Sequence, residues 1–232
     1  MTAEPLETRV TNGRFVGPDA PAAAELTIHN GQILAPTDHE VWRTVDASGH
    51  LVFPGLIQPS GIAREQALPS VRAGVTTAMA DPADHDAACL DWIHAVEVDI
   101  PIVAPDAAGT LTDDGWDILT SSIPAHFQAP AGSGFPLIHF LYHEGHLNRG
   151  MTLDRIAEIT SGCLASAFGI FPGKGSFSVG SDGDLVVFDP ESHDPYSDIL
   201  WPGRVIFSLL RGNILLYNGQ IHTSAGDGQR IQ

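Results

Sequence analysis

Lysine is almost missing from this chain. Lys174 is the only one among 11 Lys and Arg residues, and these face 28 Asp and Glu residues, so the formal net charge is −17 at pH 7. An electrostatic field of this sign repels phosphate backbones and anionic lipid surfaces. We therefore expect no nucleic acid and no membrane among the partners.

Cysteines and long apolar runs are scarce as well. Cys89 and Cys163 lie far apart and show no metal-ligand spacing, which favours free thiols in a reducing compartment. No segment approaches about 18 uninterrupted apolar residues, and Met1 to Thr11 lacks the basic start and apolar run of a signal peptide. These absences predict a cytoplasmic protein without a membrane span.

Both ends of the chain have strand-like patterns. With 43% hydrophobic residues in 232, a sizeable core is possible. From Thr8 to Leu34, short β-rich runs are broken by Asn12-Gly13 and Asn30-Gly31, which favour tight hairpin turns. Three further strand-like runs lie towards the other end: Asp184–Asp189, Val205–Leu210 and Ile214–Tyr217.

The middle of the chain alternates between strand-like and helical patterns, which favours an α/β fold with a parallel sheet. The predicted strands are Leu51–Ile57, Gly74–Ala80, Ile100–Ala104 and Trp116–Thr120. The predicted helices begin at Asp84 and Thr152, which would cap them, and reach Val96 and Gly169. The stretch from Asp106 to Gly134 has the composition of a loop.

Several blocks of sequence resemble the amidohydrolase superfamily, in its dihydroorotase, hydantoinase and dihydropyrimidinase branches. The blocks are Val45–Pro59 (VDASGHLVFPGLIQP), Arg72–Asp81 (RAGVTTAMAD), Phe135–Leu141, Met151–Gly169 and Gly173–Pro190. The resemblance implies a composite β-sandwich from residues 1–53 and 173–232 around a (β/α) TIM-like barrel of residues 54–172. That interval is less than half of the roughly 250 residues of a complete barrel, so we expect a truncated barrel with about half the strands.

The resemblance also implies which strands remain. Leu51–Ile57, Gly74–Ala80 and Ile100–Ala104 match the first, second and third barrel strands, and Trp116–Ser122 matches the last. Because the last strand of a closed barrel neighbours the first, the sheet would run last, first, second, third and have two open edges. Open strand edges are usually covered. A protein partner or self-association is therefore expected.

Members of this superfamily hold one or two zinc ions with His-x-His after the first strand, a bridging lysine or carboxylate, two further histidines and an Asp on the last strand. The metal activates a water molecule. The histidine positions fall on Ser60 and Ile62, and the Asp position falls on Ser121. The resemblance thus predicts degenerate catalytic positions, no bound zinc and no other cofactor.

One substrate-binding position persists in the resemblance. Arg64 lies where dihydroorotases carry the arginine that grips the substrate carboxylate, a role that suits the guanidinium fork. The companion Asn falls on Ala83. The alternative is that Arg64 is a solvated or structural ion-pair residue.

Other polar groups have two interpretations each. The segment HFLYHEGH contains His139, His143 and His146, which are either a metal-binding group or a packed histidine cluster. The spacing of His143 and His146 is one residue shorter than in the HExxH motif. Asp81 to Asp86 would lie beyond the second strand as site residues or as a capped loop. Asp182 and Asp184 suggest calcium, whereas the resemblance implies a structural turn. Ser60, Ser121 and Ser122 are candidate nucleophiles if a histidine joins them.

Two functions from different classes follow. The first is a non-catalytic, dihydroorotase-like subunit, a pseudoenzyme that serves as a structural or regulatory partner in a homo- or hetero-oligomer. The second is a hydrolase, or a lyase, that acts on C–N bonds of a small cyclic amide or ureide through an atypical or shared site. A decayed gene product is a third interpretation of the same substitutions.

Overall fold

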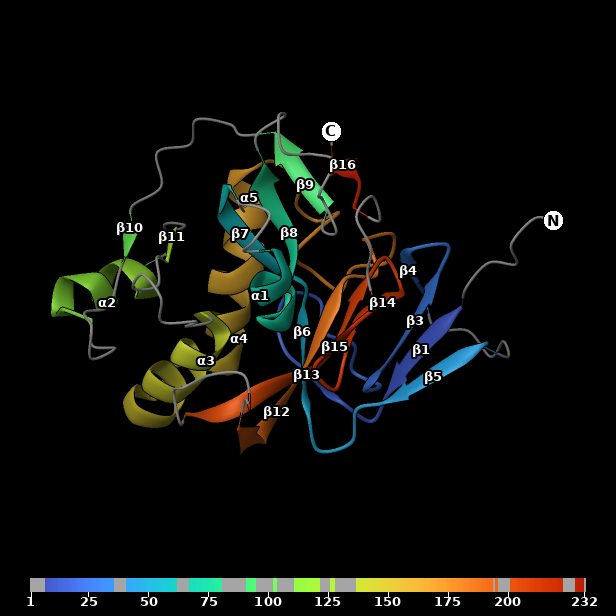
Figure 1. Cartoon of the computed structure of the whole chain (residues 1–232), viewed down its shortest axis with the longest axis horizontal. Helices are drawn as coiled ribbons and strands as arrows, with labels where there is room; N and C mark the ends of the chain where they lie inside the picture. Colours follow the sequence, from blue (N-terminus) through green and yellow to red (C-terminus); the bar gives the residue numbers. More distant parts are fainter. Residues whose placement is uncertain are drawn as a thin grey trace.

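A computed structural model describes residues 7–35, 41–61, 67–80, 91–94, 102–103, 111–121, 126–127, 137–193, 195, 201–222 and 228–231. Figure 1 shows a β-rich half that combines the first strands of the chain with β12 to β15, and a helical flank formed by the middle of the chain. Within the described residues, no helix is long and apolar enough to cross a membrane.

The β-rich ends build two sheets, as the sequence predicts. The first sheet has the order β4-β3-β1-β5, with the bounds Gln32–Leu34, Glu25–His29, Thr8–Thr11 and Arg43–Asp46. The second sheet has the order β15-β14-β13-β12-β6-β2, with the bounds Gln220–Ile221, Asn213–Tyr217, Pro202–Leu210, Leu185–His193, Leu51–Pro54 and Arg14–Phe15. Its neighbours β12 and β6 come from opposite ends of the chain and pair antiparallel.

The six-stranded sheet is buried on both faces. Val186 and Phe188 of β12 point into the core shared with the helices, whereas Leu185 and Val187 point into the core shared with the first sheet. Side chains alternate between faces along a strand, so a strand that is covered on both sides needs an uninterrupted apolar run. This requirement explains the uninterrupted apolar run LVVF at the start of β12.

A third sheet follows the order β16-β9-β8-β7, and every neighbouring pair in it is parallel. Its strands are Arg230–Ile231, Asp91–His94, Val75–Ala80 and Leu56–Gly61, and helix α1 (Ala67–Arg72) lies between β7 and β8 in the chain. The second predicted barrel strand is therefore present, whereas the first begins later than predicted, because Leu51–Pro54 is β6 of the six-stranded sheet and β7 starts at Leu56. Strand β16 was not expected here, and it pairs with β9, which lies in a segment that the sequence predicts to be helical.

Gly55 separates β6 of the sandwich from β7 of this third sheet. A Cβ atom at Gly55 would lie 2.2 Å from Oγ1 of Thr76 and 2.8 Å from Cβ of Asp184. Because such contacts are far inside van der Waals distance, the chain can pass from one sheet to the other at this point only without a side chain.

Two element predictions in the middle of the chain are wrong. The helix expected from Asp84 to Val96 contains strand β9 instead, because a short apolar run fits a buried strand as well as a helix. Trp116–Thr120, expected as the last barrel strand, lies in helix α2 (Asp113–Thr120). The Thr112 hydroxyl accepts a hydrogen bond from the Gly115 N–H at 3.2 Å and caps this helix.

The strand expected at Ile100–Ala104 is confirmed in part. Strand β10 (Ile102–Val103) pairs in parallel with β11 (His126–Phe127) in a separate two-stranded sheet. The predicted order last, first, second, third is therefore not found, and no closed barrel exists among the described residues.

A continuous helical layer covers the six-stranded sheet and reaches strand β7 (Figure 1). It consists of α3 (Leu137–Phe140), the π-helical segment η3 (Leu141–Asn148), α4 (Leu153–Ala157), the π-helical segment η4 (Glu158–Gly162) and α5 (Cys163–Ala167). The helix predicted from Thr152 is confirmed, with the Thr152 hydroxyl accepting from the Arg155 N–H at 3.2 Å. Within it, Ser161 donates to the carbonyl oxygens of Pro54 and Gly55 at 3.3 and 3.1 Å.

Candidate functional site

The carboxyl ends of β7, β8 and β9 correspond to the end of a barrel where active sites gather. Ser60 is the next-to-last residue of β7. Ile62, Arg64, Asp81 to Asp86 and Ser122 lie outside the described residues. For this group the structure therefore locates the backbone of Ser60 alone, and the roles of the others stay predictions.

Ser121 terminates helix α2 instead of a strand. Its hydroxyl donates to the carbonyl oxygen of Ile118 at 2.7 Å, and its own carbonyl accepts from the Arg155 guanidinium. Arg155 also donates to the carbonyl of Leu119 at 3.4 Å. Arg155 thus satisfies carbonyl groups that the end of α2 leaves without helical partners.

The three clustered histidines take part in three different contacts. The buried His139 ring lies edge-on to Phe188 at 5.4 Å between centroids. His143 stacks on Trp201 at 5.0 Å. Nδ1 of His146 lies 2.7 Å from the carbonyl oxygen of Met151. Among the described residues, one set of acidic, thiol or imidazole side chains lies close enough together to share a cation. That set contains none of these histidines.

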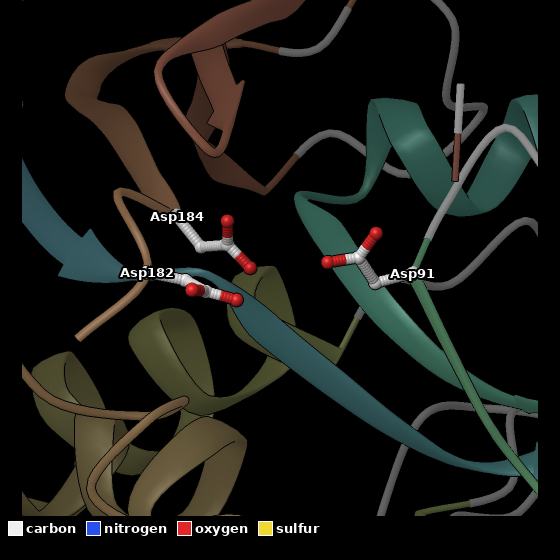
Figure 2. A group of neighbouring side chains, drawn as sticks. All are labelled: Asp91, Asp182 and Asp184. Atoms are coloured by element: carbon white, nitrogen blue, oxygen red, sulfur yellow. The ribbon is translucent and has the colours of Figure 1, made fainter. Parts of the chain in front are cut away.

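That set consists of Asp91, Asp182 and Asp184. Figure 2 shows Asp182 and Asp184 next to one another on the segment before β12, with Asp91 facing them from the start of β9. The Lys174 ammonium lies among the three carboxylates. Its Nζ atom is 2.6 Å from Asp91, 2.8 Å from Asp182 and 2.6 Å from Asp184. The side chain of Lys174 is only 3% exposed.

Two further donors complete the network. The Arg211 guanidinium pairs with Asp91, and the Arg211 N–H donates to Asp184 at 2.7 Å. The N–H of Gln229, just before β16, donates to Oδ1 of Asp91 at 2.8 Å, the oxygen that Arg211 also contacts, whereas Lys174 binds Oδ2. Three carboxylates thus share two cationic side chains, and the network has an excess of negative charge.

This charge balance determines the ionisation of the lysine. Burial acts to lower the pKa of Lys174, but the negative charges of Asp184, Asp91 and Asp182 outweigh it and hold the pKa well above its ordinary value. Burial raises the pKa of Asp184, and the neighbouring carboxylates add to that rise. Lys174 is therefore a cation at neutral pH, where the protonated amine has no free electron pair with which to act as a nucleophile or a base.

The network lies at the amino ends of the parallel strands. Asp91 is the first residue of β9, and the carbonyl of Asp184 accepts from the Gly55 N–H at 2.9 Å, one residue before β7 begins. In barrels this end carries stability and the opposite end carries catalysis. The arrangement accordingly binds the turn before β12, the β13–β14 turn and the third sheet to one another.

No family model matches the chain. It is 31% identical to the D-hydantoinase of Geobacillus stearothermophilus over 118 residues, which is 43% of this chain and 25% of the relative. It is 30% identical to the D-phenylhydantoinase of Escherichia coli strain K12 / DH10B over 109 residues, 41% of this chain and 24% of the relative. Over these matched residues the chain is homologous to hydantoinases. Its sequence match spans about a quarter of the length of these curated relatives.

Solved structures share the fold of this hydantoinase homologue. The dihydropyrimidinase of Brevibacillus agri NCHU1002 superposes with a TM-score of 0.70 at 13% identity, over 97% of this chain and 98% of that one. The D-hydantoinase (dihydropyrimidinase) of Thermus sp. gives 0.73 at 13% identity, over 96% and 98%. Within the branches that the sequence resembles, these matches are to hydantoinases and dihydropyrimidinases.

The residues of this chain do not fit the zinc site that the resemblance to amidohydrolases implies. A hydroxyl at Ser60 and an aliphatic chain at Ile62 cannot replace two imidazole ligands. The single lysine of the chain is bound to three carboxylates at the other end of the strands. Among Asp91, Asp182 and Asp184, the Lys174 ammonium takes the place that a cation would need.

The sequence contains a signal for this network that is not part of any known motif. A lone lysine between two glycines precedes the acidic turn by eight residues, and a lysine that is unique in an acidic chain is a strong candidate for a paired, buried charge. Asp91 has no such signal. Its partner Lys174 lies 83 residues away.

Proposed function

We propose that this chain is a non-catalytic, hydantoinase- and dihydroorotase-like subunit that acts as a structural or regulatory partner in a homo- or hetero-oligomer. One observation carries the proposal: the only lysine is bound in an ion-pair network at the amino ends of β7 and β9, while Ser60 and Ile62 stand at the histidine positions. Metal-assisted amide hydrolysis needs several imidazole or carboxylate ligands around an open coordination position. This chain supplies no replacement at the matching positions.

The sheets support the part of the proposal that concerns a partner. Among the described residues, β7 pairs only with β8, and β10 pairs only with β11, so each has a free side. Free strand edges bind other strands unless they are covered. The proposed occupant is another protein chain, either a longer homologue or a second copy.

The proposal is tested by measuring mass and metal together. We expect native mass spectrometry of the purified chain, or of the complex captured with it from its own cells, to give a mass above the 24.6 kDa of one chain. Elemental analysis of the same sample should give zinc far below one ion per chain. A stable monomer without a captured partner would contradict the role of subunit.

The match to hydantoinases favours one alternative function. In it, the chain hydrolyses a C–N bond of a small cyclic amide or ureide, with Arg64 gripping the substrate and the remaining groups supplied atypically or by another chain. Stoichiometric zinc and hydrolysis of hydantoin or dihydrouracil would support this alternative. Activity that is lost in Arg64→Ala but kept in Arg14→Ala, a matched arginine substitution on β2, would locate the site.

A further inference from the structure

Strand β16 covers the outer edge of β9. Arg230 and Ile231 pair in parallel with Trp92 and Ile93. Strand β9 is four residues long, and its other side pairs with β8. Without β16, β9 would be an edge strand of a sheet that is not closed in the described part of the chain. A row of free N–H and C=O groups of this kind is a template for pairing with another chain.

Two residues of parallel pairing are too few to hold a strand in place by themselves. Asp91 provides an additional attachment, because its Oδ1 atom accepts from the N–H of Gln229 at 2.8 Å. The same residue is only 1% exposed; Lys174 binds its other oxygen, Oδ2, and the Arg211 guanidinium contacts Oδ1 as well. The ion-pair network thus holds the carboxylate in the orientation in which it accepts from residue 229.

We propose that residues 228–231 are an intramolecular cap that keeps the β9 edge from pairing with the β9 edge of a second copy of this chain. Two identical edges related by a two-fold axis meet antiparallel and present the same surface to each other, so a second copy always offers a matching edge. When the hydrogen bond from Gln229 to Asp91 is present, the cap occupies the edge and the copies stay apart there. When that bond is lost, the edge becomes available.

The cap covers the β9 edge, whereas the proposed partner covers the free sides of β7 and the β10–β11 pair. The cap and the proposed partner can therefore be tested separately. A chain that forms no complex at all would contradict the proposed function and would leave the cap to be judged by its own variants.

The test compares Gln229→Pro with Gln229→Ala. The side chain of Gln229 is exposed, so alanine removes little, whereas proline removes the N–H that Asp91 accepts. Sedimentation velocity over a range of protein concentrations should show that Gln229→Pro dimerises at a concentration at least about tenfold lower than Gln229→Ala does, which equals about 1.4 kcal/mol. Hydrogen exchange should become faster at residues 230 and 231 in the proline variant. At residues 92 and 93, hydrogen exchange should be slower in the dimer than in the monomer of the same proline variant.

A second pair of variants protects the test against a folding defect at residue 229. Ile231→Pro and Ile231→Ala differ in the same way within β16, and circular dichroism must show that both keep the wild-type content of strand and helix. Equal association of the proline and alanine variants in both pairs overturns the proposal. Faster exchange of β16 without any gain in dimerisation overturns it as well.

Discussion

At the scale of single residues, the ion-pair network around Lys174 is the most constrained part of the described chain. The charges of Lys174, Asp91 and Asp184 are almost fully withdrawn from water, and a buried ion is tolerated only with close partners and saturated hydrogen bonds. The pairing does not by itself make the fold more stable than an apolar replacement of the whole network would. Removing one member, however, leaves the others uncompensated.

Lys174→Met is therefore expected to lower the free energy of unfolding by about 3–5 kcal/mol, because Asp91 and Asp184 would remain buried without their common cation. Urea unfolding at pH 7 measures this. Arg14→Met is the control, since it removes one positive charge from an exposed position on β2 and should change stability by less than about 0.5 kcal/mol. Equal effects of the two substitutions would contradict the importance of the buried pair.

The raised pKa of Lys174 makes stability sensitive to alkaline pH. The folded chain holds the proton more tightly than the unfolded chain, whose lysine titrates near about 10.4. The stabilisation is fully present below that pH, and it is lost as the pH rises towards the raised pKa. Urea unfolding between pH 9 and 12 should show a steeper fall for the wild type than for Lys174→Met. Tyr142, whose pKa burial also raises, is common to both proteins and does not affect this difference.

At the scale of elements, helix α2 shows how a cap decides between two structures. The segment DDGWDILT has a strand-like apolar end, yet Thr112 and the two aspartates of the first turn favour a helix N-terminus. Trp116 and Leu119, three residues apart, then lie on one buried face. Trp116 stacks on Phe140 of α3 at 5.4 Å, which attaches α2 to the helical layer.

Thr112→Ala is expected to destabilise this helix by about 1 kcal/mol, because the Gly115 N–H loses its acceptor. Thr112→Ser keeps the hydroxyl oxygen and should retain most of the stability. The side chain of Thr112 is exposed, so the pair isolates the cap from packing. Hydrogen exchange of residues 113–120 would be faster in the alanine variant alone, and exchange that is equal in both variants would argue against the cap.

At the scale of the whole molecule, the net charge of −17 opposes folding through self-repulsion. Salt screens repulsion between exposed charges over a Debye length of about 8 Å at 0.15 M. We expect the melting temperature to rise as NaCl increases from about 0.01 to 0.15 M and to change little beyond that. Glucose at matched osmolality is the control, and a melting temperature that falls with added NaCl would contradict the prediction.

The sequence by itself determined the features that depend on neighbours within a few residues. Asn30-Gly31 forms the predicted hairpin turn between β3 and β4, with φ values of 50° and 84°, and Thr152 begins the predicted helix. Asn12 also has a positive φ of 61°, but the hairpin predicted there is wrong, because β1 and β2 belong to different sheets. The resemblance to amidohydrolases was also readable, because sequence blocks survive in order. These features need no knowledge of distant contacts, since hydrogen bonds and steric limits inside a turn or cap suffice.

Only the tertiary structure decided which distant surfaces meet. Asp91–His94 is a strand because β8 and β16 pair with its two sides, although the same residues suit a helical pattern. Asp91 becomes part of a buried network because Lys174 and Arg211 arrive from segments 83 and 120 residues away. The sequence alone shows that lysine is scarce. The position of Lys174 among three carboxylates, however, depends on long-range packing, which local patterns do not encode.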